Sequence, residues 1–437
     1  MSIVTDGLRS DKWRPFAKQK LQMLKDLGLT TKNYNINGYR ISLSTMDGID
    51  KARITAPPYT SIGGGYHHVL MSDPQGDLWV WGNNQRGQLG TGDLVDRATP
   101  ERIQADVPWA MIARGRGATS AAIRKDGTLW VWGYNNGSTF SEPVPELNGT
   151  LGLGLGLPDH VLTPTQIGVE HTWAFVVTGT SRSTYAIKTD GTLWVWGLDL
   201  GYLGLGAYGT GPLIVSEPTR VGLDTDWRTV STHEAGAMAI KADGTLWAVG
   251  QNRFGALGLG DDVPRYAFTQ VGSDTWRRIV VGFDSAAGIK SDGTLWATGD
   301  APFYRPVGSI GVFLQVGAGN EWVDIASDQT ALLAVKAGGS TWATGYSCDG
   351  RLGPAALPSC PTGNESTPLT ELGQYATNGG IFTTQFTAVS VSPDGGQWWW
   401  GLLPGEPDPA QTVTTPQEIV GARVMLPATE PLVPPWL

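Results

Sequence analysis

The residues whose types could support catalysis are few, and they form no recognisable catalytic set. No combination of Ser, His and Asp, or of Cys and His, recurs at a spacing typical of nucleophilic catalysis. The five histidines are His67, His68, His160, His171 and His233. Glu142, Glu146, Asp159 and Glu170 could face one another, but a carboxylate pair alone is too general to indicate a glycosidase. The sequence therefore predicts a protein that is not an enzyme, with no catalytic residues, no metal and no cofactor.

Two further features invite a chemical interpretation that the sequence does not support. The run Leu151–Gly156 alternates leucine with glycine, but its spacing does not fit a dinucleotide fingerprint and no helix is expected after it. Cys348 and Cys360 are the only cysteines. They could close a small disulfide loop or remain two thiols, and the lack of a secretion signal favours thiols. No further metal ligands lie near them.

Composition and charge exclude two classes of partner. The formal net charge is −9 and the pI is about 5.1, which disfavours binding to phosphate backbones. The densest basic group is Arg114, Arg116, Arg124 and Lys125, interpreted as solvated surface charges. No apolar stretch approaches the ~18 residues of a membrane span. We expect no nucleic acid and no membrane span. The missing secretory signal predicts a protein that is made in the cytoplasm, or one that leaves the cell by another route, such as lysis.

A tryptophan that follows a tight turn recurs along the chain, most clearly as Asp-Gly-Thr-Leu-Trp at residues 126–130, 190–194, 243–247 and 292–296. Because these tryptophans occupy equivalent positions in the repeats, we expect them to pack in the structural core and not to form a surface that binds carbohydrate. These core tryptophans are Trp79, Trp130, Trp194, Trp247, Trp296, Trp342 and Trp398. A second aromatic precedes each of the first six by 20 or 21 residues: Tyr59, Trp109, Trp173, Trp227, Trp276 and Trp322.

Each repeat indicates four short strands. An apolar strand enters the Asp-Gly turn, whose glycine suits a type I′ hairpin, and an alternating strand returns from it. A glycine-rich loop such as residues 82–90 follows, and then a strand led by proline, as at Thr99–Ile103. Seven such units predict an all-β fold, a seven-bladed β-propeller of four-stranded blades. The last proline-led strand, residues 415–422, is expected to complete the first blade and so close the ring, although residues 51–55 compete for that place.

The motif Asp-Gly-Thr-Leu-Trp-Val-Trp-Gly followed by Asn-x-x-Gly-x-Leu-Gly resembles the repeat of the regulator of chromosome condensation family. That resemblance implies a seven-bladed propeller over residues 51–422, and a structural role for His67 and His68. The regular form of the motif resembles the bacterial and phage branch. The glycine-rich loop is missing after Trp296 and Trp398, which predicts degenerate fifth and seventh blades.

The two ends of the chain differ from the repeats. Residues 1–50 are predicted to form an anchoring arm, with a helix at about 14–27 followed by extended chain. The alternative is a cap packed on the propeller. Residues 423–437 form a proline-rich tail. The arm residues expected to make contacts are Trp13, Phe16, Leu21, Leu24 and Leu27.

Non-repeating side chains in the loops are the candidates for partner contact, because recognition usually uses loops on a rigid scaffold. They are Tyr134, Asn135, Asn136, Tyr202, Tyr208, Tyr266, Phe303, Tyr304, Tyr346 and Arg351. The favoured function is a structural or binding protein of a phage particle, located in the capsid or tail. Its arm would bind virion proteins and its propeller a protein or host-surface receptor. The alternatives are a guanine-nucleotide exchange factor for a small GTPase, or a proteinaceous enzyme inhibitor.

Overall fold

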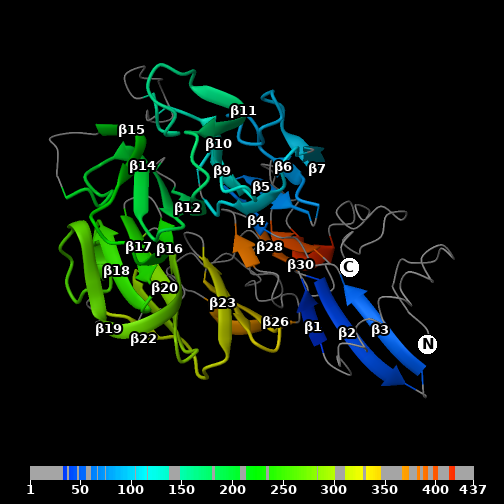
Figure 1. Cartoon of the computed structure of the whole chain (residues 1–437). Helices are drawn as coiled ribbons and strands as arrows, with labels where there is room; N and C mark the ends of the chain where they lie inside the picture. The colour runs from blue at the N-terminus through cyan, green and yellow to red at the C-terminus, as the bar shows by residue number, and fades with distance from the viewer. Residues whose placement is uncertain are drawn as a thin grey trace.

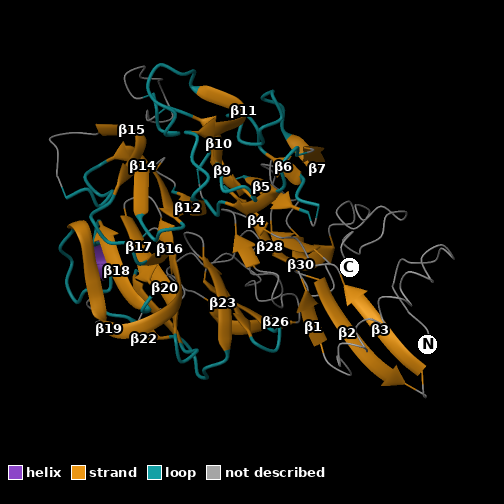
Figure 2. Cartoon of the chain, in the orientation of Figure 1, coloured by secondary structure: helices purple, strands orange, loops and turns teal. Residues whose placement is uncertain are grey.

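The part of the chain that the computed structural model describes consists of antiparallel β-strands joined by loops and turns (Figure 2). The helical element among the described residues is one 3-10 turn, η2 (Arg253–Gly255), and no helix there is long and apolar enough to span a membrane. The structure describes residues 33–36, 39–46, 49–55, 61–65, 67–73, 75–103, 105–115, 117–136, 148–179, 183–206, 213–232, 236–282, 284–300, 311–327, 331–345, 367–373, 381–383, 387–391, 397–401 and 413–418.

The strands from Ser61 onward form six antiparallel sheets arranged around an axis, and the seven-stranded sheet among them makes two blades, so the ring has seven blades (Figure 1). This confirms the predicted propeller. The strands of a blade are called A to D from the axis outward. The blades are numbered in chain order. Blades 1 to 3 are β4 (Ser61–Gly64), β5 (His68–Ser72), β6 (Leu78–Gly82) and β7 (Arg97–Ile103) in blade 1; β8 (Trp109–Ile112), β9 (Thr119–Arg124), β10 (Leu129–Tyr134) and β11 (His160–Ile167) in blade 2; and β12 (Trp173–Thr178), β13 (Ser183–Lys188), β14 (Leu193–Asp199) and β15 (Leu213–Arg220) in blade 3. Blades 4 to 7 are β16 (Trp227–Thr232), β17 (Gly236–Lys241), β18 (Thr245–Gly250) and the first part of β19 (Arg265–Val281) in blade 4; the rest of β19 with β20 (Ser285–Lys290), β21 (Leu295–Gly299) and β22 (Leu314–Gln315) in blade 5; β23 (Trp322–Ser327), β24 (Ala331–Lys336), β25 (Thr341–Gly345) and β26 (Thr367–Gly373) in blade 6; and β27 (Ile381–Thr383), β28 (Thr387–Val391), β29 (Gln397–Gly401) and β30 (Val413–Glu418) in blade 7.

Strand β19 serves two blades. Its first part pairs with β18 as the D strand of blade 4, and from Trp276 it pairs with β20 as the A strand of blade 5. The D strand of blade 5, β22, has only two residues, in agreement with the predicted degeneracy of that unit. Blade 7 has a complete D strand in β30.

A separate three-stranded antiparallel sheet precedes the ring. It consists of β1 (Asn33–Ile36), β2 (Tyr39–Met46) and β3 (Ile49–Thr55), with β2 in the centre. Figure 1 shows this sheet outside the ring of blades. Strand β3 includes residues 51–55, which the sequence assigns to the start of the propeller, and the predicted helix at 14–27 lies outside the described residues.

The ring does not close in the predicted way. The last proline-led strand, β30, pairs with β29 of its own blade, and blade 1 has its own D strand in β7. The expectation that the final strand would complete the first blade is therefore wrong. The reason is the phase of the repeat: each unit starts at the aromatic of strand A and ends with the proline-led strand, so every blade is made from one continuous stretch of chain.

In blades 2 to 5 the Asp-Gly-Thr-x-Trp motif holds the hairpin between strands B and C by a chain of hydrogen bonds. In blade 3 the Asp190 carboxylate accepts from the Thr192 amide at 3.0 Å and from its hydroxyl at 2.7 Å. The Thr192 hydroxyl oxygen in turn accepts from Trp194 Nε1 at 2.8 Å. Gly191 has φ +77°, and a Cβ there would lie 2.1 Å from the Thr225 carbonyl oxygen, so the turn requires glycine. The same bonds recur at Trp130, Trp247 and Trp296.

In blades 2 to 6, two tryptophans and one basic side chain pack together behind the turn. In blade 4 the rings of Trp227 and Trp247 meet edge to face, with centroids 6.1 Å apart. The Lys241 ammonium lies 4.9 Å and 4.5 Å from these two centroids. It also pairs with Asp224 at 2.8 Å and Asp226 at 3.1 Å. Burial alone would lower the pKa of Lys241, but its hydrogen bonds to the two carboxylates raise it.

The motif tryptophans are half-buried parts of this arrangement, not fully enclosed side chains. This holds for Trp79, Trp130, Trp194, Trp247, Trp296 and Trp342. The fully buried indoles are instead those of strand A and the second tryptophan of strand C, as with Trp132 and Trp196. The corresponding basic residues in the other blades are Arg124, Lys188, Lys290 and Lys336.

We expect Thr192→Val to destabilise the protein by about 1–2 kcal/mol, because it leaves the Trp194 N–H and the Asp190 carboxylate without their shared partner. Thr192→Ser keeps the hydroxyl and should stay near the wild type. Urea unfolding followed by tryptophan fluorescence measures both. Equal loss in the two variants would contradict the role given to the hydroxyl.

We expect Lys241→Met to cost about 1–2 kcal/mol, because it keeps the alkyl stem but removes the charge that contacts two indoles and two carboxylates. Lys125→Met, at an exposed turn position, is the matched control and should change stability by less than about 0.5 kcal/mol. Thermal unfolding of the two variants makes the comparison. A Lys241→Met protein as stable as the control would show that the charge contributes nothing.

Candidate binding surfaces: the loop face and the central channel

The antiparallel order within a blade brings the A–B and C–D connections to the same side of the ring. In blade 2, Thr119 at the start of β9 pairs with Gly133, and Tyr134 at the end of β10 pairs with His160. Strand β8 also ends here, close to Arg114. We call this side the loop face. The Asp-Gly turns and the D–A connections lie on the opposite side.

Every partner-contact candidate chosen from the sequence falls in or beside a C–D connection, so those that the structure describes lie on the loop face. Tyr134, Asn135 and Asn136, however, are almost fully buried. Asn135 accepts a hydrogen bond from the Leu151 amide at 3.0 Å, and its amide donates to the Pro158 carbonyl at 3.2 Å. These side chains shape the loop from within and offer little surface to a partner.

The same hydrogen-bonding pattern holds the C–D loops of blades 1 and 4 in place. Asn84 accepts from the Leu89 amide and donates to Asp93, and Asn252 accepts from the Leu257 amide and donates to Asp261. A buried amide must satisfy its hydrogen bonds, and here it does so by holding the loop leucine in place. The sequence marks this role by repeating Asn two residues after the glycine at the end of strand C, at Gly82, Gly133 and Gly250, a signal that the partner-contact interpretation of Asn135 missed.

Tyr202 and Tyr266 remain available on the loop face. They come from neighbouring blades 3 and 4, and their rings stack with centroids 5.9 Å apart and planes inclined by 12°. Tyr266 is 37% exposed. Among the described residues, the large hydrophobic side chains exposed in or beside the C–D loops are Leu94, Val95, Leu155, Leu200, Leu213, Phe254, Val263, Tyr266 and Val312. The remaining two exposed ones, Val169 and Leu223, lie on the opposite side.

Several predicted residues lie outside the described part of the chain. They are the loop candidates Tyr208, Phe303, Tyr304, Tyr346 and Arg351, the arm residues Trp13, Phe16, Leu21, Leu24 and Leu27, and the cysteines Cys348 and Cys360. The side chain of Trp398 is likewise not described, although its backbone belongs to β29.

His68 has the structural role that the resemblance implies. It is fully buried, and its Nε2 lies 2.9 Å from Ser120 Oγ in the next blade. Ser120 donates to the Gln88 carbonyl at 2.7 Å, so the Nε2–H of His68 donates to Ser120. Burial lowers the pKa of His68 to about 3, which keeps it neutral. Across the described ranges, no group of three or more His, Cys, Asp or Glu side chains could hold a metal ion.

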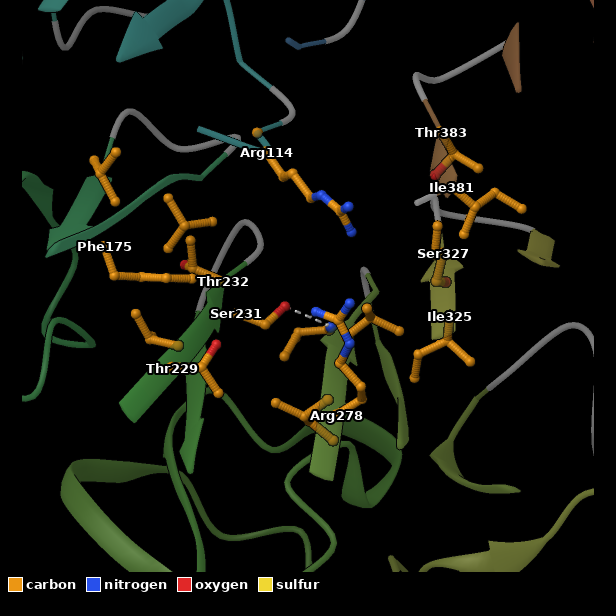
Figure 3. A pocket seen from close by; sticks show the side chains of 18 of the residues that line it. Arg114, Phe175, Thr229, Ser231, Thr232, Arg278, Ile325, Ser327, Ile381 and Thr383 are labelled. Atoms are coloured by element: carbon orange, nitrogen blue, oxygen red, sulfur yellow. Dashed lines mark hydrogen bonds between the residues drawn. The ribbon is translucent and has the colours of Figure 1, made fainter. Parts of the chain in front are cut away.

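The A strands enclose a cavity of about 270 Å³ on the axis of the ring, which we call the central channel. Strand A of every blade contributes to its lining, from Ser61 in blade 1 to Thr383 in blade 7. The lining includes the apolar residues Met111, Phe175 and Val177. Figure 3 shows Phe175 together with hydroxyl-bearing lining residues: Thr229, Ser231, Thr232, Ser327 and Thr383.

Two arginines reach into this channel. Figure 3 shows the side chains of Arg114 and Arg278 extending toward each other from opposite walls. The Arg278 guanidinium is 3.0 Å from the Asp324 carboxylate of the next blade. Burial lowers the pKa of Arg114; Asp324 raises it and Arg278 lowers it further, so the three charges act on one another.

The basic group at 114–125 is therefore not simply solvated. Arg114 reaches into the channel, and Arg124 lies 4.8 Å and 3.9 Å from the ring centroids of Trp109 and Trp130. For Arg124 the sequence did contain a signal, because a basic residue recurs two positions before the turn aspartate in four units. Arg114 carried no such signal, since no other blade has a charged residue at its position.

Blade number, sheet order and hairpin define the class of fold as a seven-bladed β-propeller. Residues 75–122 and 59–88 each match the family described as "Regulator of chromosome condensation (RCC1) repeat". The chain is 30% identical over 216 residues to the ultraviolet-B receptor UVR8 of Arabidopsis thaliana, covering 47% of this chain and 44% of that protein. It is 42% identical over 74 residues to the X-linked retinitis pigmentosa GTPase regulator of Mus musculus, covering 16% of this chain and 7% of that protein.

The chain spans less than half the length of these two relatives. Among solved structures, it is similar to Prp20p of Saccharomyces cerevisiae, described for its binding properties to Gsp1p and histones. That likeness has a TM-score of 0.63 at 16% identity and covers 78% of this chain and 85% of Prp20p. At this identity it shows the fold alone.

Proposed function

We propose that this chain is a non-enzymatic, protein-binding propeller whose loop face docks its partner. The observation that carries this proposal is the one-sided distribution of exposed apolar side chains. They follow the C–D loops of blades 1 to 5, with the Tyr202–Tyr266 stack at the junction of two blades. Aromatic side chains on a rigid scaffold bury a large area on binding at a small cost in conformational entropy.

We propose further that the protein is a component of a phage particle. Two features support this: the regular Asp-Gly-Thr-Leu-Trp form of the repeat, and a three-stranded sheet outside the ring that is available to attach the propeller. Residues 1–55 would bind a capsid or tail protein, and the loop face would bind a protein or host-surface receptor.

The test is incorporation into particles, followed by mass spectrometry, and adsorption of those particles to host cells. We expect a chain lacking residues 1–55 to be absent from particles while still folding as a ring. We expect Tyr202→Ala/Tyr266→Ala to be incorporated but to weaken adsorption roughly tenfold or more, because two anchors are lost.

Leu223→Ala is the matched control, since Leu223 is 87% exposed on the opposite side of the ring. Particles that incorporate the truncated chain normally would contradict the anchoring role of residues 1–55. Equal adsorption of the tyrosine variant and the control would contradict docking through the loop face.

A second candidate is a guanine-nucleotide exchange factor. It is favoured by the fold shared with Prp20p and by the match to a GTPase regulator. An exchange factor would accelerate release of a fluorescent guanine nucleotide from a small GTPase by about 100-fold or more at micromolar concentrations. We expect no acceleration above the intrinsic rate, and a clear acceleration would replace the first proposal.

A further inference from the structure

The two channel arginines break the repeat at positions where the fold needs no charge. Strand pairing aligns Arg114 with the last A-strand positions of the other blades, which are Gly64, Thr178, Thr232, Val281, Ser327 and Thr383. It aligns Arg278 with Ser61, Met111, Phe175, Thr229 and Asp324. Small, hydroxyl-bearing or apolar residues therefore suffice to build nearly all of this wall.

The charges of the described residues that line the channel do not cancel. Asp324 accepts the Arg278 guanidinium at 3.0 Å, and its Oδ1 also accepts from the Ile325 amide at 2.9 Å. For the Arg114 guanidinium, the described residues offer no hydrogen-bond acceptor. Arg114, Arg278 and Asp324 together leave one positive charge inside a protein whose net charge is −9. A partly enclosed charge of this kind is costly unless a counter-charge joins it.

The position of Arg114 is fixed by the backbone. The segment at Arg114 forms parallel bridges to Gly64 of blade 1 and Val177 of blade 3. The Gly115 amide donates to the Gly64 carbonyl at 2.9 Å, and the Gly64 amide donates to the Ala113 carbonyl at 3.1 Å. The guanidinium thus extends from a backbone segment held on both sides, which makes the site preorganised.

We propose that the central channel binds a small organic carboxylate, with its oxyanion between Arg114 and Arg278 and its apolar part against Met111 and Phe175. The single excess charge favours a singly charged carboxylate over a doubly charged phosphate. A guanidinium forms paired hydrogen bonds with the two oxygens of a carboxylate. The volume of about 270 Å³ is that of about nine water molecules at ~30 Å³ each, which suits a ligand of roughly ten heavy atoms.

Isothermal titration of the full chain with benzoate tests the proposal, with benzamide and inorganic phosphate as comparison probes. We expect saturable 1:1 binding of benzoate in the millimolar range, and benzoate affinity at least about tenfold above that of either comparison probe. Benzamide has the same shape without the charge. Benzoate binding no stronger than benzamide or phosphate binding would overturn the assignment.

Three substitutions are expected to change the affinity for benzoate, two of them by lowering it and one by raising it. Arg114→Gln and Arg278→Gln should each weaken benzoate binding about tenfold, because each removes a charge-assisted contact. Asp324→Asn should strengthen it about threefold or more, because it frees Arg278 and keeps an oxygen for the Ile325 amide. Arg220→Gln, an exposed position on strand β15, is the matched control and should leave the affinity unchanged.

Unfolding temperatures confirm that each variant retains the fold. If Asp324→Asn weakens binding as much as Arg278→Gln does, the residues act only through channel structure and the site is refuted. Affinities unchanged by Arg114→Gln also refute it. The titration needs no protein partner, so its result is independent of whether the loop face docks one.

Discussion

The structure depends on the packing of each sheet against the next, because adjacent blades share almost no backbone ladder. The described apolar clusters each combine residues of two neighbouring blades. In the cluster between blades 1 and 2, Leu89 from a C–D loop packs with Trp109 of strand A and Trp132 of strand C. The glycine-rich loop of one blade therefore packs directly against the paired tryptophans of the next blade. The hydrophobic term that holds the ring together acts between blades rather than within them.

This packing separates the scaffold from the surfaces that can bind. Side chains of strands B and C pack between neighbouring blades, and the hydrogen-bonded Asp-Gly hairpins lie on the side of the ring opposite the loop face. What remains is the C–D loops at one end and the inner wall of strand A. The loops are rigid because buried amides such as Asn84 and Asn252 hold them, so exposed aromatics there keep a defined position. The inner wall is equally rigid, and its two arginines are placed without cost to the inter-blade contacts.

The sequence predicted the fold well because its period and hairpin chemistry are local. An Asp-Gly turn followed by Thr and Trp determines which strands pair, and the repeat determines the number of blades. It predicted the site less well. Asn135 was taken as a partner contact because burial of an amide in a loop depends on a leucine sixteen residues later. Arg114 was taken as a surface charge because the channel forms only when seven A strands meet, which no local pattern records.

Each blade is one unbroken stretch of chain, and among the described strands only β19, which continues from blade 4 into blade 5, belongs to two of them. Gene duplication or loss of a single unit of about fifty residues would consequently add or remove a whole sheet without cutting a ladder. A ring fastened by a shared strand would forbid such steps, because its first and last units depend on each other. The short fifth blade, whose outer strand is reduced to Leu314–Gln315, shows how far one unit can erode while its neighbours keep their own pairing.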